Sequence, residues 1–208
     1  MQVVVLANDE LKEELLSHGV SESINISWVS SPEILVDQEA DSYFDLLFDF
    51  DDARINLLKQ ISSKPVFINA VNGTLENLPA NFVRINAWPT FLKRAIVEAA
   101  ADEKIRMKAA EIFTGFNRHV EWVDDIPGMI SARVVSMIIN EAYFTIDEGV
   151  TSKSETDKAM KLGTNYPYGP FDWAQKIGLR KILTLLEELS RVEERYHPSA
   201  LLKKEATS

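Results

Sequence analysis

The feature that most constrains this chain is a long apolar segment, Met129–Ile146, in which apolar residues fall on every side of a helix. It follows Asp125-Ile-Pro-Gly128, which is not helix interior, because proline fixes φ and restricts the residue before it. A helix that is apolar all round is buried all round. The segment approaches the length of a membrane span, but Arg133, Asn140 and Glu141 interrupt it. We therefore expect a core helix, enclosed by other helices or by a second subunit.

Shorter helices are predicted after this segment. Gly149 is placed to end the long helix in the left-handed conformation. The pattern of Ser154–Gly163 predicts a helix with Ser154 as its N-cap and Gly163 as its stop. A last helix is expected from about residue 171 to about residue 196, with a break at Gly178. Residues 125–208 thus predict an all-helical domain.

The sequence before this domain alternates short apolar runs with short helical patterns. The runs read as strands are Val3–Leu6, Ile24–Val29, Phe44–Phe50, Val66–Ala70, Phe82–Ala87, residues 92–99 and His119–Val123. Residues 92–99 would also suit a helix. Helices are expected at residues 9–17, 32–36, 52–61 and 102–116. This alternation predicts a doubly wound α/β domain with a parallel sheet over residues 1–124.

The motifs of the helical half resemble the C-terminal domain of the 3-hydroxyacyl-CoA dehydrogenase family. The residues that carry the resemblance are Asp125–Gly128, Asn140-Glu-Ala142, Glu148-Gly-Val150, Asp157 with Ala159–Gly163, Pro167–Phe171 and Tyr196-His-Pro198. They cover nearly all of residues 124–204 at the family's spacing. The resemblance implies an N-terminal Rossmann-like domain, NAD-dependent oxidoreductase chemistry in fatty acid or acyl-CoA metabolism, and a homodimer built on the C-terminal helices. Activity has to be argued from the site.

The first βα turn is unsuited to a dinucleotide. Such a turn needs glycines, so that the pyrophosphate can approach the backbone at a helix N-terminus. Here it reads Leu6-Ala-Asn-Asp-Glu-Leu11, without glycine and with two carboxylates where the pyrophosphate would lie. Ser30-Ser31 stands where an acidic residue would hold the ribose. We expect a degenerate, shortened Rossmann-like domain and no bound cofactor, with NAD implied by the resemblance alone.

The catalytic positions implied by the resemblance also differ. The family's catalytic histidine lies twelve residues before a glutamate that orients it, and Glu98 matches that glutamate. Counting back twelve residues gives Asn86, and a one-residue gap gives Ile85. Ala132 stands at the catalytic asparagine, and the family's serine falls near residues 72–74. Neither Asn86 nor Ile85 can act as a general base, so Glu98 is read as a relic, or as an ordinary surface carboxylate.

A substrate site, if retained, is expected between the domains. Trp88, with Pro89 and Phe91, would form one wall, and Met129, Arg133 and Met137 the other. An aromatic and methionine lining suits a thioester arm, and acyl-CoA is the expected ligand. Alternatively, Arg133 pairs with Glu141 or Glu98.

Composition excludes several other classes. There is no cysteine, and the three histidines form no zinc motif. Asp49, Asp51 and Asp52 could hold a cation, but such a run more often caps a helix. We expect no metal site. A formal charge of -10 argues against nucleic acid and membrane partners, and an opening strand without a signal peptide favours the cytoplasm.

Three functions remain open. The first is a 3-hydroxyacyl-CoA dehydrogenase homologue, a pseudoenzyme or much altered, that still binds acyl-CoA. The second is a non-catalytic dimerising structural or regulatory subunit. The third is a working NAD-dependent dehydrogenase with displaced motifs.

Overall fold

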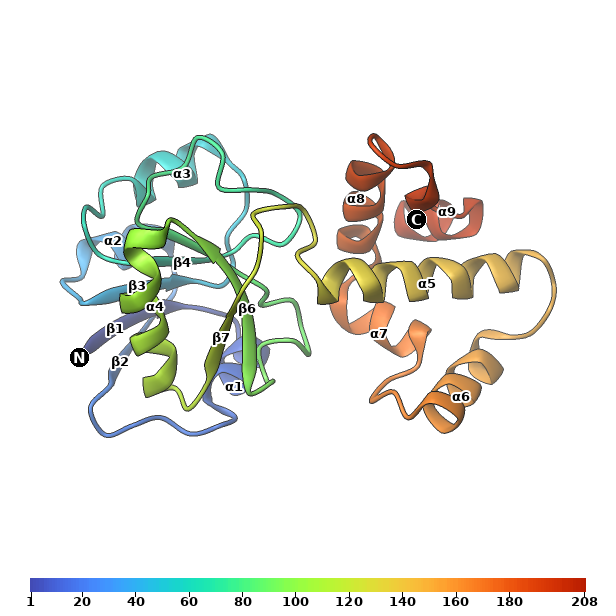
Figure 1. The fold of residues 1–208 in the computed structure, drawn as a ribbon, viewed down its shortest axis with the longest axis horizontal. Coiled ribbons are helices and arrows are strands. Elements are labelled where there is room, and N and C mark those ends of the chain that lie inside the picture. The colour runs from blue at the N-terminus through green and yellow to red at the C-terminus, as the bar shows by residue number, and fades with distance from the viewer. The chain divides into compact units, whose positions relative to one another are not determined.

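The computed structural model describes all 208 residues, which form two compact units, Met1–Met129 and Ile130–Ser208 (Figure 1). The division falls after Met129 rather than after residue 124. Arg84 of the first unit explains the difference, because its guanidinium binds the carboxylate of Asp125 and the carbonyl of Ile126. No helix of either unit is long and apolar enough to cross a membrane.

The first unit is built on one seven-stranded sheet in the order β2-β1-β3-β4-β5-β6-β7. Its strands are β1 (Gln2–Leu6), β2 (Asn25–Val29), β3 (Ser42–Asp45), β4 (Val66–Asn69), β5 (Phe82–Ile85), β6 (Ile96–Ala101) and β7 (His119–Trp122). Its helices are α1 (Asp9–Leu16), α2 (Pro32–Asp37), α3 (Asp52–Leu58) and α4 (Glu103–Gly115). The winding reverses between β1 and β3, which is the point where folds of this class bind ligands.

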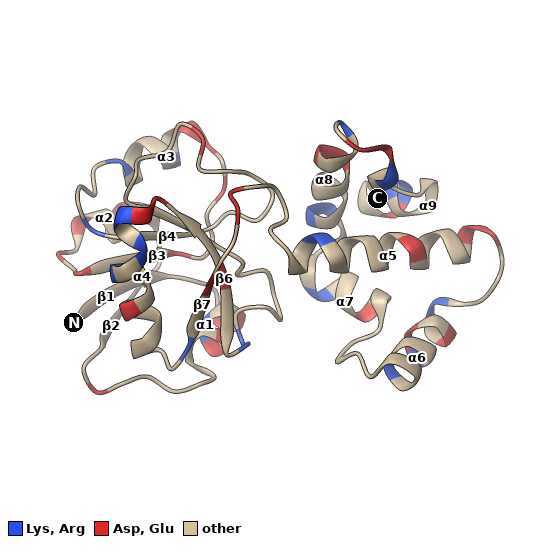
Figure 2. Cartoon of the chain, viewed as in Figure 1, with Lys and Arg blue, Asp and Glu red and all other residues tan.

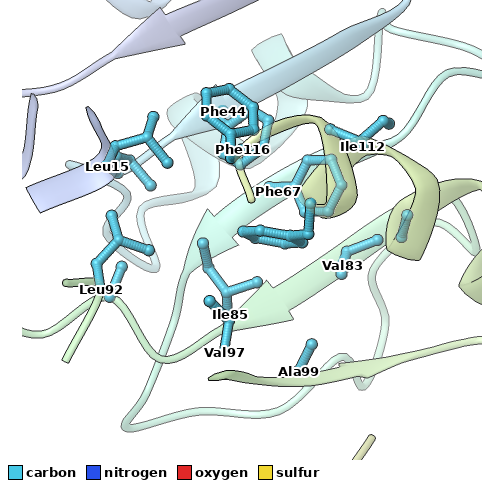
Figure 3. Close-up of a cluster of buried hydrophobic side chains, with 14 of the residues drawn as sticks. Leu15, Phe44, Phe67, Val83, Ile85, Leu92, Val97, Ala99, Ile112 and Phe116 are labelled. Carbon is cyan, nitrogen blue, oxygen red and sulfur yellow. The ribbon is translucent and has the colours of Figure 1, made fainter. Parts of the chain in front are cut away.

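Helices cover both faces of this sheet, as a doubly wound fold requires. On one face, α1 and α4 pack on a core in which the Phe44 ring stacks on Phe67 at 4.2 Å, with Phe113 and Phe116 meeting them edge-on (Figure 3). On the other face, α2 and α3 pack through Leu35 and Leu58. The predicted Rossmann-like α/β domain is confirmed.

Two strands differ from the expectation. Strand β3 ends at Asp45, although the next residue, Leu46, is still buried in the core and donates its backbone N–H to the carbonyl of Leu6. Strand β6 pairs antiparallel with β5, with Val83 opposite Ala101. The connection between them, residues 86–95, is too short for the crossover that a parallel pair needs.

The second unit is entirely helical. It contains α5 (Ser131–Asp147), α6 (Lys153–Thr164), α7 (Pro170–Ile177), α8 (Leu179–Ser190), the 3₁₀ turn η1 (Glu194–Tyr196) and α9 (Ala200–Ala206). Gly149 and Gly178 adopt positive φ, of 71° and 95°, where the helix end and the break were predicted. Helix α9 was not predicted.

The predicted ends of α6 were wrong. Its N-cap is Ser152, not Ser154, because Ser152 and Glu155 form a reciprocal capping box. Gly163 lies inside the helix, which ends at Asn165 in the left-handed conformation.

Helix α5 is not buried on every side within this chain. Ala132, Val135, Ile139 and Tyr143 lie on its buried face, against α7, α8 and α9. Val134, on the opposite side, is 53% exposed. The prediction of a fully enclosed helix therefore does not hold for a single chain.

Candidate functional site

The carboxyl ends of the central strands are tied together by one side chain, Asn69. Its Nδ2 donates to the carbonyls of Leu46, after β3, and Ala87, after β5, at 3.2 and 2.9 Å. Its Oδ1 accepts from the backbone N–H of Ala87 at 3.1 Å. Asn69 thus sets the position at which the chain leaves β5.

Directly before Ala87, Asn86 faces Glu98 of β6. The Asn86 Nδ2 donates to Glu98 Oε2 at 3.2 Å, and the Asn86 backbone N–H donates to the Glu98 carbonyl at 3.0 Å. The Asn86 Oδ1 lies 3.4 Å from the backbone nitrogen of Trp88. Asn86 is 2% exposed, and Glu98 is half-buried. The structure therefore brings together the two residues that the twelve-residue spacing pairs.

The two candidates for the histidine position, Ile85 and Asn86, lie in different surroundings. Ile85 lies in the hydrophobic core, on the sheet face covered by α1 and α4. Asn86 is the residue hydrogen-bonded to Glu98. Chemically, a carboxamide can donate and accept hydrogen bonds, but near neutral pH it cannot take up a proton as imidazole does. Asn86 can orient a polar group without serving as a general base.

The loop after Asn86 is held by a buried carboxylate of α1. The Glu14 Oε1 accepts from the backbone N–H of Thr90 at 2.5 Å, and Thr90 has a φ of 80°, which is strained for a β-branched residue. Burial raises the pKa of Glu14, partly offset by this hydrogen bond and by the charge of Lys93.

The buried side chain of Arg118 holds the same loop through hydrogen bonds. It is 1% exposed, and its guanidinium donates to the carbonyls of Leu92, Arg94 and Leu15, among others. Burial lowers the pKa of Arg118 to about 10, against the opposing charge of Glu14. Glu14 and Arg118 together fix the loop over residues 86–95.

Where the winding reverses, between β1 and β3, the first βα turn is capped by one of its own side chains, that of Asn8. The Asn8 Oδ1 accepts from the backbone N–H of Leu11 at 2.9 Å, so it occupies one of the donors that a phosphate would use. Asp9 and Glu10 lie exposed in the first turn of α1. Next to this turn, Asp45 is buried at the end of β3 and bound by two nitrogens of Arg54, at 2.7 and 2.5 Å. Burial raises the pKa of Asp45, and Arg54 opposes that rise.

The donor set at this turn does not fit the pyrophosphate of NAD. A close approach needs glycine backbone and open N–H groups, and the turn offers a capped helix with two carboxylates. After β2, Ser31 caps α2 by accepting from Ile34 at 3.4 Å and presents no carboxylate to a ribose. No cluster of three or more His, Asp or Glu side chains could hold a metal ion.

The expected substrate residues divide between the two units. Trp88, Phe91 and Met129 belong to the first unit and are each no more than 3% exposed. Arg133 and Met137 belong to the second unit, where they line one groove. The joint wall expected from these residues stays a prediction. Ala132, at the asparagine position, is fully buried in α5.

The groove of the second unit has a volume of about 540 Å³ and lies between α5, α6 and α7. Arg133 is at its edge, with the guanidinium 5.5 Å from the centre of the Tyr196 ring. Glu141 contributes to the same groove, but its carboxylate makes no hydrogen bond or ion pair. The expected pairing of Arg133 with Glu141 is therefore not formed within the chain.

The remaining polar and aromatic candidates have structural roles. Asp51 caps α3 by accepting from Arg54 at 3.0 Å, as the capping interpretation predicted. Asn140 binds the carbonyl of His197 at 2.9 Å. Trp173 is buried against the rings of Tyr166 and Tyr168.

Sequence reasoning missed Asn69, Glu14 and Arg118. Asn69 could have been found, because it is a polar residue that directly follows the buried run Val66–Ile68. Glu14 looks like any exposed residue of an amphipathic helix. Arg118 lies beside His119 in a polar stretch, and no local signal predicts its burial.

A family model and curated relatives place the chain's helical region with the 3-hydroxyacyl-CoA dehydrogenases. Residues 128–207 match the family model described as 3-hydroxyacyl-CoA dehydrogenase, C-terminal domain. The 3-hydroxyadipyl-CoA dehydrogenase of Escherichia coli (strain K12) is 49% identical over 86 residues, which are 40% of this chain and 18% of that protein. The 3-hydroxybutyryl-CoA dehydrogenase of Bradyrhizobium diazoefficiens is 31% identical over 132 residues, 61% of this chain and 45% of that protein. The matched region spans less than half the length of either relative.

Solved structures show the same fold. The (S)-3-hydroxybutyryl-CoA dehydrogenase of Ralstonia eutropha superposes with a TM-score of 0.74, covering 98% of this chain and 92% of that chain at 18% identity. A 3-hydroxybutyryl-CoA dehydrogenase of Escherichia coli is 35% identical, with a TM-score of 0.59, over 68% of this chain and 31% of that chain.

Proposed function

We propose that this chain, whose residues 128–207 match the model of the 3-hydroxyacyl-CoA dehydrogenase C-terminal domain, is a family member that binds acyl-CoA without NAD-dependent oxidation. The observation that carries the proposal is the hydrogen bond from Asn86 to Glu98. It occupies the place where the resemblance puts a histidine and the glutamate that orients it.

Oxidation of a 3-hydroxyl group requires a base for the hydroxyl proton and an acceptor for the hydride. The Asn86 carboxamide supplies no base, and loss of a general base typically lowers the rate by about 10²–10⁴. The first βα turn is unsuited to the pyrophosphate of the hydride acceptor. Two independent requirements fail at two separate places, so one displaced residue would not restore the reaction.

The proposed ligand is a short acyl-CoA thioester. The relatives named above act on 3-hydroxyadipyl-CoA and 3-hydroxybutyryl-CoA according to their names. Arg133 and Met137, which line the groove of the second unit, would contact the thioester arm.

The test is calorimetry with acetoacetyl-CoA and, separately, titration with NADH followed by its fluorescence. We expect saturable heat with acetoacetyl-CoA, reduced in Arg133→Ala, and no saturable fluorescence change at micromolar NADH. Saturable NADH binding with turnover would refute the proposal in favour of a working dehydrogenase.

The second candidate is a dimerising structural or regulatory subunit, favoured by the exposed apolar side of α5 at Val134. No heat with acetoacetyl-CoA in either protein, together with no NADH binding, would replace the acyl-CoA proposal with this one.

A further inference from the structure

Strand β2 lies at one end of the sheet and has a neighbouring strand on one side only. The Asn25 backbone N–H donates to the carbonyl of Met1, directly before β1, at 2.9 Å. Because the backbone groups of successive residues in a strand point to opposite sides, those of Ser27 also face β1, and those of Ile26 and Trp28 face away from it. The N–H and C=O groups of these two residues have no partner within the chain.

Strand β2 lacks the features by which exposed sheet edges usually avoid further pairing. Such edges carry charged side chains, a proline or a bulge. The strand reads Asn-Ile-Ser-Trp-Val, without charge or proline, and it pairs with β1 in unbroken register from Asn25 to Val29. In Figure 2 it carries neither of the two charge colours. This edge is therefore open to one further strand.

We infer that β2 pairs antiparallel with β2 of a second copy of this chain, about a two-fold axis at Ser27. In an isologous contact, each residue meets the residue equally far on the other side of the axis. Ile26 precedes Ser27 and Trp28 follows it, so Ile26 of each copy lies opposite Trp28 of the other. Residues that face each other in this way exchange both of their backbone hydrogen bonds, and all the outward groups of both strands are satisfied.

The side chains of β2 also favour a second copy. Ile26 and Trp28 lie on the sheet face that packs against the core, so each cross-strand pair joins a β-branched to an aromatic side chain, which is favourable. Ser27, on the other face, meets the same residue of the second copy at the axis. Its Oγ accepts from Gln2 Nε2 at 2.8 Å, which leaves the hydroxyl proton to donate across the axis. Two chains of formal charge -10 thus meet through an uncharged strand.

The opposite edge of the sheet, β7, differs in this respect. The His119 backbone N–H donates to the carbonyl of Ala95 at 2.9 Å, so by the same alternation the backbone groups of Val120 and Trp122 face outward. Pairing them across a two-fold axis would place Glu121 opposite Glu121 of the second copy. Like charges directly opposite each other destabilise a strand pair. The side chains therefore disfavour self-pairing at β7 and permit it at β2.

The inference concerns the first unit alone and does not depend on the proposed function. The chain has no cysteine, so Ser27→Cys introduces its single thiol. In an antiparallel pair, facing residues without mutual hydrogen bonds have Cα atoms about 4.5 Å apart, which suits a disulfide. Exposed Ser30 is three residues from the axis, so two Ser30→Cys thiols would lie about 20 Å apart. We expect copper-phenanthroline oxidation of the full chain at micromolar concentration to link Ser27→Cys at least about tenfold faster than Ser30→Cys.

Charge at the axis gives a second test, read as the mass of the full chain by sedimentation. Ser27→Glu and Ser27→Lys should each at least halve the wild-type mass, because like charges meet at the axis. An equimolar mixture of the two should restore it, and Ser30→Glu should keep it. Circular dichroism checks that each variant is folded. Equal linking rates for the two cysteine variants, a wild-type mass for Ser27→Glu, or a mixture no heavier than its components would each overturn the inference.

Discussion

At the scale of single residues, the site is defined by what Asn86 can and cannot do. It keeps the hydrogen-bond geometry of an oriented side chain, including its contact with Glu98, but a carboxamide offers no proton acceptor near neutral pH. Neighbouring side chains hold Asn86 in place, since Asn69 fixes the end of β5 and Glu14 fixes the loop beyond it. Asn86 therefore fits the local structure, and under the proposed function its carboxamide is the reason that no base is present.

The first prediction follows from that contrast. We expect Asn86→His/Ala132→Asn to fold but to show no NADH-dependent reduction of acetoacetyl-CoA, because the first βα turn still lacks a cradle for the pyrophosphate. The check is the loss of NADH absorbance under saturating substrate, with a circular dichroism melt as the control for folding. Turnover above the buffer background would contradict it.

A second prediction concerns Glu14, whose folded-state pKa is raised by burial. A raised pKa means that the folded state holds the proton more tightly than the unfolded state does. The contribution of Glu14 to stability is thus greatest below its ordinary pKa of 4.5 and falls as the pH rises through the raised value. Glu14→Gln keeps an oxygen for the Thr90 N–H but removes this titration.

We expect the loss of melting temperature between pH 4.5 and pH 7 to be smaller in Glu14→Gln than in the wild type. Glu13→Gln, on the exposed side of the same helix, is the matched control and should leave the slope unchanged. Equal slopes in all three proteins would refute the assignment.

At the scale of elements, helix ends are set by specific side-chain contacts. The start of α7, which is capped by a side chain of α6, is an example. Asp157 of α6 accepts from the backbone N–H groups of Phe171 and Asp172 at 2.8 and 3.1 Å, so it caps α7 from another helix. Gly169 makes room for this carboxylate, since a Cβ there would lie 2.3 Å from the Asp157 Cγ.

Two glycine substitutions should therefore act in opposite directions. Gly169→Ala should destabilise the chain by about 1–3 kcal/mol, because it displaces the capping carboxylate. Gly163→Ala, inside α6 with no atom within 4 Å of the new Cβ, should stabilise it by up to about 1 kcal/mol. Urea unfolding measures both, and a destabilised Gly163→Ala or a neutral Gly169→Ala would count against this account.

How far sequence predicted these elements depends on whether the signal was local. The strands Val66–Asn69 and His119–Trp122 and the break at Gly178 were predictable, because alternation and glycine act within a few residues. Ser152 could also have been predicted as the N-cap of α6, since Glu155 stands three residues later, but the prediction named Ser154. The end of β3 was not predictable, because Leu46–Phe48 are as apolar as the strand before them.

The same distinction between local and long-range signals applies to the residues of the site. The pairing of Asn86 with Glu98 could be expected from spacing, once the family was recognised. The contact of Glu14 with Thr90 spans 76 residues, and no local sequence pattern near either residue predicts it. Arg118 reaches carbonyls from both α1 and the loop, and only the assembled fold brings those groups together.

At the scale of the whole molecule, the two units differ in how far apart in sequence their contacting residues lie. In the sheet, every neighbour of β1 is reached through a crossover, with Val4 opposite Ser27 on one side and Tyr43 on the other. In the helical unit, successive helices such as α6 and α7 pack together.

That difference has a kinetic consequence. Contacts between residues far apart in the sequence cost loop-closure entropy before they contribute any stabilisation. Sheets of this kind therefore form slowly, and helical units form fast. Refolding from urea should therefore show two phases, and the tryptophans can report them separately. Trp173 is the single tryptophan of the helical unit, while Trp28, Trp88 and Trp122 lie in the sheet unit. A variant that keeps only Trp173 should recover its fluorescence in the fast phase, whereas Trp173→Phe should report the slow one.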